Sequence, residues 1–341
     1  MKSLALLCGG PSGEHEISLI SAKHFVRAMK RELYDLRIIW WDRDGVFRLV
    51  SEDRLAAISD QPDQSLDLGG QPLRFEKAGI RLKESSIPID LAFPLLHGTG
   101  GEDGRIQGFL ETLGIPFVGA GLRASVLGMD KALTKLMAQR RGVNVIPFEL
   151  VRQGARLAAP KNLPCFVKPS GSGSSLGVSL VKSEKDWEEA LKEAWKQGPV
   201  AMVEPKVVGR EIEIALLDDG QNRIASPGGE IRCTDFEFYS YDAKYVSSKG
   251  VDLIAPADLT DEQARSLESA AWSVFDSIGC QALARVDFFL TESGELLLNE
   301  INTMPGFTPI SMYPRLMQLA GVPYSELIER LLNSIQIPKS A

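Results

Sequence analysis

A β-hairpin near the C-terminus, residues 285–302, constrains the fold of this chain more than any other feature. Two β-rich runs flank a short polar turn that ends in glycine, which is the pattern of a hairpin. Side chains two residues apart on a strand share a face, so Arg285 and Asp287 point the same way. For the same reason, Glu300 and Asn302 share a face of the second strand.

The same alternation predicts that Leu296 and Leu298 precede the two polar residues on one face of the second strand. If the polar faces of the two strands coincide, oxygen ligands gather in one small space: Asp287, Glu300 and Asn302. Magnesium that is also held by nucleotide phosphates binds through such ligands. The hairpin therefore favours Mg-nucleotide chemistry, although carboxylates on a strand also occur as an ordinary solvated face.

Bulk composition limits the class of protein. A chain of 341 residues is long enough for two or three domains with a substantial core. Its net charge of −7 argues against a general binder of nucleic acid or of anionic membranes. The 4 cysteines are far apart, form no metal-type pair, and indicate buried thiols in a reducing cytoplasm. The apolar start, residues 1–8, is too short for the core of a signal peptide, and no segment approaches the about 18 apolar residues of a membrane span.

Strands and helices alternate from the N-terminus onward. A buried-strand pattern at residues 4–8 leads through a glycine-rich loop into a helix at 18–29 and a strand at 37–41, which opens an α/β unit with a parallel sheet. Residues 52–86 indicate surface loops or a small hairpin, and 119–121 a domain junction. Further strands are predicted at residues 89–96, 116–118, 165–168, 176–181, 200–204 and 211–217, and further helices at 106–113, 133–141, 184–196, 261–277 and 324–334.

A loop of glycine and serine follows a predicted strand at residues 168–177. Lys168 leaves the strand as a positive charge, and the small residues after it, Ser174 and Ser175 among them, offer many N–H and O–H donors. Such a segment can close over a triphosphate and let the backbone approach it. It is not a P-loop, because no Gly-Lys-Ser/Thr followed by a helix is present. A flexible linker is the alternative, but linkers rarely lie between two β-rich runs with a lysine at the base.

Other charged residues have two interpretations each. Lys131 stands at a helix start, where a lysine is commonly just solvated. Glu204 and Glu211 flank a short linker that could meet a nucleotide base with its backbone and a ribose with a carboxylate, although Glu211 also fits an exposed strand residue. Glu14, in the first β–α loop, could hold an ammonium group or favour the helix N-terminus through its dipole. His97 opens a second glycine-rich loop and could transfer protons or position Glu14.

Two C-terminal segments complete the candidates. The aromatic-rich connection at residues 232–254 has little periodicity and is typical of a functional lid, with an ordinary anchored loop as the alternative. After the hairpin, Gly306 could present its N–H to a developing oxyanion. Ser311 and the N–H of Met312 follow and could bind a carboxylate.

Eight segments form an ordered set of motifs along the chain: GGPSGEHEIS from Gly9, HGTGGEDG from His97, MDK ending at Lys131, KPSGSGSSLG from Lys168, GREIEIA from Gly209, YDAKY from Tyr241, ARVDFFL from Ala284 and LNEINTMPGFTPISMYP from Leu298. This set resembles the D-alanine–D-alanine ligase family of ATP-grasp enzymes over nearly the whole chain. The resemblance implies an α/β (α+β) ATP-grasp fold with an N-terminal Rossmann-like parallel-sheet domain. It implies three domains, at residues 1–121, 122–206 and 207–341, with ATP between the last two.

The resemblance also implies roles for individual residues. Phosphates would be bound by Lys131, Lys168 and Lys244, and Ser174 and Ser175 would also contact the nucleotide. Adenine and ribose would be bound by Glu204, Val207 and Glu211. Two Mg²⁺ (or Mn²⁺) would be held by Asp287, Glu300 and Asn302. A linked group at the first D-alanine would comprise Glu14, Ser174 and Tyr245. The oxyanion would be stabilised by Arg285 and Gly306. The second D-alanine would meet His97, Ser311 and Met312.

The implied activity is ATP-dependent ligation of two D-alanines to D-alanyl-D-alanine through an acyl phosphate, for peptidoglycan precursor synthesis in the cytoplasm. Related ligases that make a D-alanyl-D-lactate ester tend to differ at Tyr245 or to lack the Lys-Tyr pair, so this residue favours an amide product. Mild departures from the family pattern, at Gly171-Ser172 and at Met312, remove no needed group. The alternatives are a D-lactate or D-serine acceptor, a catalytically silent nucleotide sensor, and a dinucleotide oxidoreductase, for which no GxGxxG follows the first strand. A homodimer is a family expectation.

Overall fold

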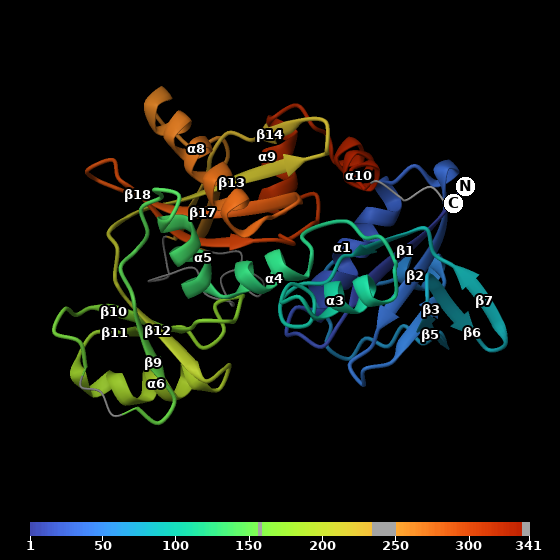
Figure 1. Cartoon of the computed structure of the whole chain (residues 1–341), viewed down its shortest axis with the longest axis horizontal. Helices are drawn as coiled ribbons and strands as arrows, with labels where there is room; N and C mark the ends of the chain where they lie inside the picture. The colour runs from blue at the N-terminus through green and yellow to red at the C-terminus, as the bar shows by residue number, and fades with distance from the viewer. Residues whose placement is uncertain (156–158, 234–249, 336–341) are drawn as a thin grey trace.

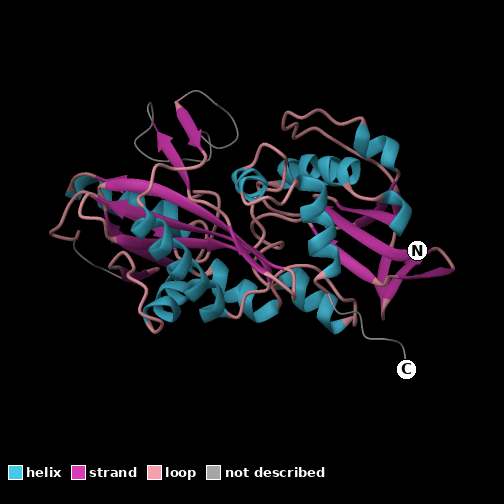
Figure 2. Ribbon diagram, turned by 90° about the horizontal axis from the view of Figure 1, so that it is seen from above, coloured by secondary structure: helices cyan, strands magenta, loops and turns pink. Residues whose placement is uncertain are grey.

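The computed structural model describes residues 1–155, 159–233 and 250–335. The molecule is elongated, with the large N-terminal sheet and a small three-stranded sheet at one end and two other sheets at the opposite end (Figures 1 and 2). Lys244 and Tyr245 lie outside the described residues, as does most of the connection at 232–254.

The N-terminal sheet has the strand order β4-β3-β2-β1-β8. At its centre, β1 (Lys2–Gly9) pairs in parallel with β2 (Tyr34–Trp41) and with β8 (Leu91–Pro94), which confirms the predicted parallel α/β unit. Helix α1 (His15–Ala28) crosses between β1 and β2 and begins before the predicted residue 18. The outer strands β3 (Phe47–Val50) and β4 (Gln71–Pro72) are antiparallel additions.

The segment at residues 52–86 is more ordered than the predicted loops or hairpin. It contains the short helix α2 (Glu52–Ala56) and a small sheet of β5 (Arg74–Glu76), β6 (Gly79–Leu82) and β7 (Ser85–Pro88). Because these strands are short and mostly polar, periodicity gave little signal for them. The predicted strand at 116–118 is reduced to one bridge, between Phe117 and Ala92.

Three helices follow the N-terminal sheet: α3 (Arg105–Thr112), α4 (Leu122–Met129) and α5 (Lys131–Gln139). Asp130 caps α5, since its carboxylate accepts the N–H groups of Ala132 and Leu133. Capping residues satisfy the free N–H groups of the first turn. Helix α4 was not predicted, and α5 starts earlier than predicted, so Lys131 is fixed in a helical first turn.

The central sheet is antiparallel, in the order β11-β10-β12-β9. Its strands are β9 (Glu149–Arg152), β10 (Cys165–Pro169), β11 (Ser179–Val181) and β12 (Val200–Pro205). Helix α6 (Trp187–Trp195) covers one face and buries Trp187, Leu191 and Ala194 against it. The predicted helix at 184–196 is confirmed, with its first turn as a separate 3-10 turn at Glu184–Asp186.

The C-terminal sheet has the order β16-β15-β13-β17-β18, with β14 paired to β13. The strands are β13 (Gly209–Asp218), β14 (Arg223–Ala225), β15 (Gly229–Cys233), β16 (Val251–Ile254), β17 (Ala282–Thr291) and β18 (Leu296–Asn302). The accompanying helices are α8 (Asp261–Ile278), α9 (Met312–Leu319) and α10 (Tyr324–Asn333). A capping box at Thr260 starts α8, and Gly279, in the left-handed conformation, ends it.

The predicted hairpin is confirmed, but it contains a β-bulge at Asn299. Asp287 pairs with Glu300, whereas the next residue of β17, Phe288, pairs with Leu298. A bulge sets two residues of one strand against one residue of its partner. Leu298 therefore lies with Phe288 in the buried core, while Asn299 and Glu300 both face away from that core.

The bulge makes one prediction from alternation wrong. Leu296 and Leu298 do not share the face of Glu300, because the inserted residue reverses the faces of the strand between them. The predicted meeting of the two polar faces is confirmed, since Arg285 lies opposite Asn302 across the hairpin.

The buried core does not separate at every predicted domain junction. The N-terminal sheet shares one cluster with α9 and α10, which includes Phe93, Phe307 and Tyr313. Helices α4 and α5 contribute to a second cluster with α8 and the C-terminal sheet, and the central sheet has a small cluster of its own. The division at 1–121, 122–206 and 207–341 stays a prediction. Cys8, Cys165 and Cys280 are free and buried, as the sequence indicated.

Candidate functional site

A pocket of about 580 Å³ lies between the central sheet and the C-terminal sheet. Strands β10 and β12 line one side, and β13, β15, β17 and β18 line the other. It includes seven predicted residues: Lys131, Lys168, Ser175, Glu204, Val207, Glu211 and Glu300. The Gly-Ser loop and the linker at 205–208 complete its walls, as expected for a site that holds a nucleotide.

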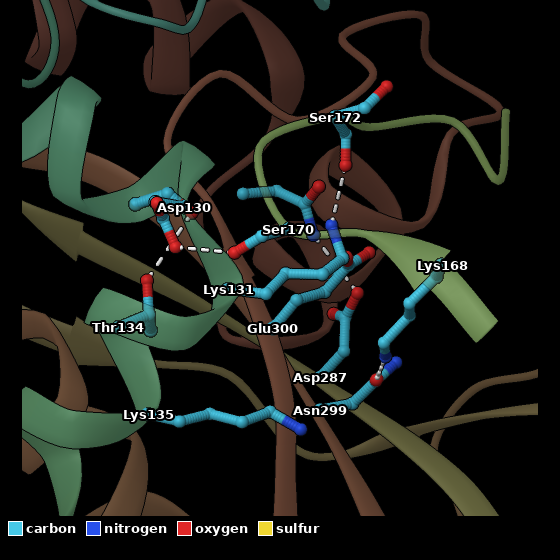
Figure 3. A network of polar contacts seen from close by, with 12 residues as sticks. Asp130, Lys131, Thr134, Lys135, Lys168, Ser170, Ser172, Asp287, Asn299 and Glu300 are labelled. Atoms are coloured by element: carbon cyan, nitrogen blue, oxygen red, sulfur yellow. Dashed lines mark hydrogen bonds and ion pairs between the residues drawn. The ribbon is translucent and has the colours of Figure 1, made fainter. Parts of the chain in front are cut away.

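Lys131 connects the Gly-Ser loop to the hairpin (Figure 3). Its Nζ donates to the carbonyl of Ser172 at 2.7 Å and lies 2.8 Å from Glu300 Oε2. The base of the loop is fixed as well, since Ser170 donates its hydroxyl to Asp130 at 2.8 Å. Lys131, for which simple solvation was the alternative, is thus buried and lines the pocket.

Glu204 is buried between two lysines. Its Oε1 pairs with Lys135, and its Oε2 lies 2.7 Å from Lys168 Nζ. Burial alone would raise the pKa of Glu204, but Lys168 and Lys135 outweigh it and hold that pKa below its ordinary value. Lys168 Nζ also donates to Asn299 Oδ1 at 3.3 Å (Figure 3).

The polar face of the hairpin forms one charged cluster. Arg285 donates to both carboxylate oxygens of Asp287 at 2.8 Å and lies 3.2 Å from Glu213. Burial opposes the charge of Arg285, but Asp287 and Glu213 raise its pKa well above the ordinary value. Asn302 donates its amide to Asp287 at 3.0 Å. Arginine, carboxylates and amide are therefore preorganised on one surface.

The oxygen donors on this surface fit magnesium. Asp287 and Glu300 are register partners, and the amide of Asn302 is held against Asp287 with its nitrogen, which leaves its oxygen on the other side. Oxygen donors of this kind suit a hard cation. Among the residues that the structure describes, no group of three or more His, Cys, Asp or Glu side chains gathers for a metal, so the amide oxygen is needed for the set.

Glu14 and His97 lie together in the part of the predicted site that the N-terminal loops contribute. Ser12 connects their loops: its hydroxyl donates to the His97 carbonyl at 2.7 Å and accepts the Glu14 N–H at 3.1 Å. The ring of His97 contacts the Met304 carbonyl through Nδ1 at 3.0 Å and Ser21 Oγ through Nε2 at 3.3 Å. Burial lowers the pKa of His97 despite Glu14. These contacts favour the positioning role for His97.

Ser311 and Gly306 approach each other where α9 begins. A Cβ at Gly306 would lie 3.2 Å from Ser311 Oγ, and the Thr308 N–H donates to that same oxygen at 3.2 Å. Ser311 is the N-cap of α9, a position that favours an anion beside it. Met312 is buried, with its side chain against Gly229, so any contact with a ligand would be made by its backbone N–H.

The remaining predicted residues have distinct positions. Ser174 and Ser175 both adopt positive φ, a conformation that is uncommon outside glycine and often marks a functional loop. Val207 and Glu211 lie on the linker and on β13. The structure does not describe Lys244 or Tyr245, so the roles implied for them stay predictions.

Three residues of the site were missed in the sequence. Lys135 follows Lys131 by one helical turn, and Asn299 is the bulged residue next to Glu300. Glu102 accepts the Gly98 N–H at 3.2 Å, and burial and the nearby Glu14 raise its pKa to about 8. The four-residue spacing of the lysines and the adjacent Asn-Glu pair in an alternating strand were the available signals.

Comparison with known proteins gives the family. The D-ala D-ala ligase N-terminus matches residues 3–120, and the D-ala D-ala ligase C-terminus matches residues 137–333. The chain belongs to the D-alanine–D-alanine ligase family, whose members are ATP-dependent ligases with the ATP-grasp fold.

Individual relatives and solved structures are similar to this chain over nearly its full length. D-alanine–D-alanine ligase A of Chromobacterium violaceum is 42% identical, with 97% of this chain and 94% of that protein covered. The D-alanine–D-alanine ligase structure from Coxiella burnetii superposes with a TM-score of 0.84 at 32% identity, covering 98% of this chain and 94% of that one. The VanG D-Ala:D-Ser ligase of Enterococcus faecalis superposes with a TM-score of 0.85 at 29% identity, covering 98% and 99%. Within the described part of the chain, no helix has the length and apolar character of a membrane span.

Proposed function

We propose that this ligase joins two D-alanines to D-alanyl-D-alanine, with ATP bound in the pocket between the central and C-terminal sheets. The observation that carries the proposal is the convergence of Lys131 and Lys168 with the polar face of the hairpin at one end of that pocket. The linker at residues 205–208 and Glu211 would receive adenine and ribose, with Glu204 beside the base.

Magnesium or manganese ions would be held by Asp287, Glu300 and Asn302. Bound there, they would offset charge on the phosphoryl group during transfer. Glu300 forms an ion pair with Lys131, and Asp287 forms one with Arg285. Both carboxylates of the proposed ion site therefore already contact a cationic side chain of the protein.

Activation of a carboxylate is the first chemical need, because a free carboxylate is a poor acyl donor. The carboxylate of the first D-alanine attacks the γ-phosphorus of ATP, the bond to the bridging oxygen of ADP breaks, and an acyl phosphate forms. Lys131, Lys168 and the predicted Lys244 would bind the phosphates while Glu14 holds the ammonium group. Tyr245 and Ser174 would complete the group around that substrate.

The amine of the second D-alanine, having released one proton to solvent, then attacks the acyl carbon, and the nitrogen releases its second proton to the departing phosphate as the amide forms. Arg285 and the Gly306 N–H stabilise the tetrahedral oxyanion, and one such donor is typically worth about 3 kcal/mol. Collapse of that intermediate expels phosphate and leaves the amide. Ser311 and the Met312 N–H would orient the second carboxylate. The Gly-Ser loop and the 232–254 connection would exclude water from the acyl phosphate.

The deciding experiment measures phosphate release from ATP with D-alanine against L-alanine, and then identifies the product with D-alanine, D-serine and D-lactate in competition. We expect phosphate release with D-alanine but not with L-alanine, and the dipeptide of two D-alanines as the main product. Phosphate release that does not depend on D-alanine contradicts the proposal. A D-alanyl-D-serine product would instead show that the second substrate is D-serine, the acceptor named for the Enterococcus faecalis structure.

The proposal extends to a cytoplasmic homodimer. Two-fold dimers are the commonest soluble oligomers. Apolar side chains are exposed on adjacent helices α4 and α5, among them Leu122, Val126 and Leu136. Sedimentation equilibrium should give twice the mass of the chain, and a monomer at micromolar concentration contradicts this part.

A further inference from the structure

Lys135 is a buried lysine that does not reach the pocket. It lies one turn after Lys131 on α5, and both side chains extend from the same side of the helix (Figure 3). Lys131 lines the pocket, whereas Lys135 is fully buried and is not among the described residues that line it. A lysine is almost never fully buried without a partner. Its partner is Glu204.

Glu204 holds two lysines of different kinds. Lys168 lines the pocket, lies 2.7 Å from Glu204 Oε2, and also contacts Asn299. Lys135 contacts Glu204 Oε1 from behind the pocket wall. Two positive charges and one negative charge leave one positive charge for the trio, and Lys168 is the member that can bring it to a ligand.

The presence of Lys135 lowers the free-energy cost of moving Lys168 away from Glu204. A phosphate that attracts Lys168 draws it away from Glu204, and a buried carboxylate left without a cation is strongly unfavourable. If Lys168 were the sole cation on Glu204, that cost would oppose nucleotide binding. Because Lys135 stays on Oε1, Glu204 keeps a counter-ion when Lys168 turns to the ligand.

Both partners carry their charges near neutral pH. Burial lowers the pKa of Lys135 to about 8, against the opposing attraction of Glu204, and the two lysines hold the pKa of Glu204 low. Lys168 and Lys131 also face Lys135 and disfavour its charge. The ion pair behind the wall is therefore present under ordinary conditions.

We propose that Lys135 is a positioning residue for nucleotide binding, the permanent counter-ion of Glu204 that leaves Lys168 available to the polyphosphate. The inference rests on the proposed function, because it takes a polyphosphate to be the ligand of this pocket. It assigns a role to a residue that touches neither nucleotide nor amino acid.

The test compares three variants of the full chain with wild type: Lys135→Met, Glu204→Gln and the double variant. Lys135→Met should raise the KM for ATP about tenfold or more, a loss of roughly 1.4 kcal/mol in binding, with the KM for D-alanine unchanged. Removing the charge of Glu204 as well restores one free positive charge, so the double variant should recover most of the affinity for inorganic tripolyphosphate, a ligand that has no base for Glu204 to contact. Lys192→Met, an exposed lysine on α6, is the matched control and should change neither constant.

Binding of inorganic tripolyphosphate, measured by calorimetry, separates phosphate binding from recognition of the base and does not depend on turnover. Glu204→Gln should bind it at least as tightly as wild type, and this holds as a test even if Lys135→Met fails to fold. The inference is overturned if Lys135→Met binds tripolyphosphate with unchanged affinity. It is also overturned if the double variant binds tripolyphosphate as weakly as Lys135→Met does. Failure of wild type to bind ATP or tripolyphosphate would instead reject the proposed function.

Discussion

Arg285 and Asp287, two residues apart on β17, form a two-pronged ion pair in which Nε and Nη2 of the arginine each lie 2.8 Å from a carboxylate oxygen. The strand period places them on one face, and the pair keeps both charges in a largely buried position. The proposed oxyanion donor and a proposed magnesium ligand are thereby held by each other. Loss of either group should act on catalysis before it acts on folding.

Replacing Asp287 with asparagine tests this relationship. The variant keeps the shape of the side chain, and Arg285 still faces Glu213 at 3.2 Å, so the protein should fold. ATP-dependent phosphate release should fall by more than about 100-fold, since charge stabilisation supplies most of phosphoryl-transfer catalysis. The measurement is a phosphate-release assay with circular dichroism as the folding check. Asp276→Asn, in an exposed pair with Arg223, should leave release unchanged, and near-normal turnover of Asp287→Asn would remove the metal assignment.

The bulge at Asn299 gives a prediction about stability. With the bulge, Leu298 is fully buried in the core, so Leu298→Ala should lower the free energy of unfolding by about 2–5 kcal/mol. Leu297→Ala, at a half-buried position of the same strand, should cost clearly less. Urea denaturation of the two variants decides the matter. A larger loss in Leu297→Ala than in Leu298→Ala would mean that the strand alternates without a bulge.

Glu102 should make stability depend on pH. Burial and Glu14 raise its pKa from 4.5 to about 8 in the folded protein. Between those values the folded state keeps a proton that the unfolded chain has released, so stability falls as pH rises through this window. Glu102→Gln has no titrating group at this position. The melting temperature of the variant should therefore rise relative to that of wild type as the pH increases from 5 to 8. Glu84→Gln, at an exposed turn, is the control and should follow wild type. A constant difference between Glu102→Gln and wild type over this range contradicts the assignment.

Gly98 keeps space for Glu14. A Cβ at Gly98 would lie 2.7 Å from Glu14 Oε2, and the residue has a positive φ. Gly114 also has a positive φ and carries a similar backbone cost, but a Cβ there meets nothing within 4 Å. Gly98→Ala should raise the KM for D-alanine and leave the KM for ATP unchanged, because it displaces the carboxylate proposed to hold the first substrate. Gly114→Ala should lose comparable stability with unchanged kinetics, and matching kinetics in both variants would exclude the steric explanation.

The loop of Lys244 and Tyr245 gives a prediction that rests on sequence alone. Tyr245→Phe should raise ester formation relative to amide formation when D-alanine and D-lactate compete as acceptors. Product analysis by mass spectrometry measures the ratio. An unchanged ratio would count against the role implied for this hydroxyl.

The sequence by itself determined the family, the strand and helix order around the parallel sheet, and the polar residues of the hairpin. These follow from local periodicity and from motifs whose residues stand close together in the chain, so no tertiary information was needed.

Only the tertiary structure decided which side chains meet. Glu204 lies between Lys135 and Lys168 because β10 and β12 pair and because α5, which packs against β18, carries Lys135 to the same carboxylate. Those residues are far apart in sequence. The bulge at Asn299 arises from pairing with β17, and no pattern within β18 alone specifies where one extra residue is accommodated. The pKa of Glu102 is likewise set only after folding, because burial and the charges around it, from Glu14 in the first loop, Arg285 on β17 and Glu300 on β18, come from separate parts of the chain.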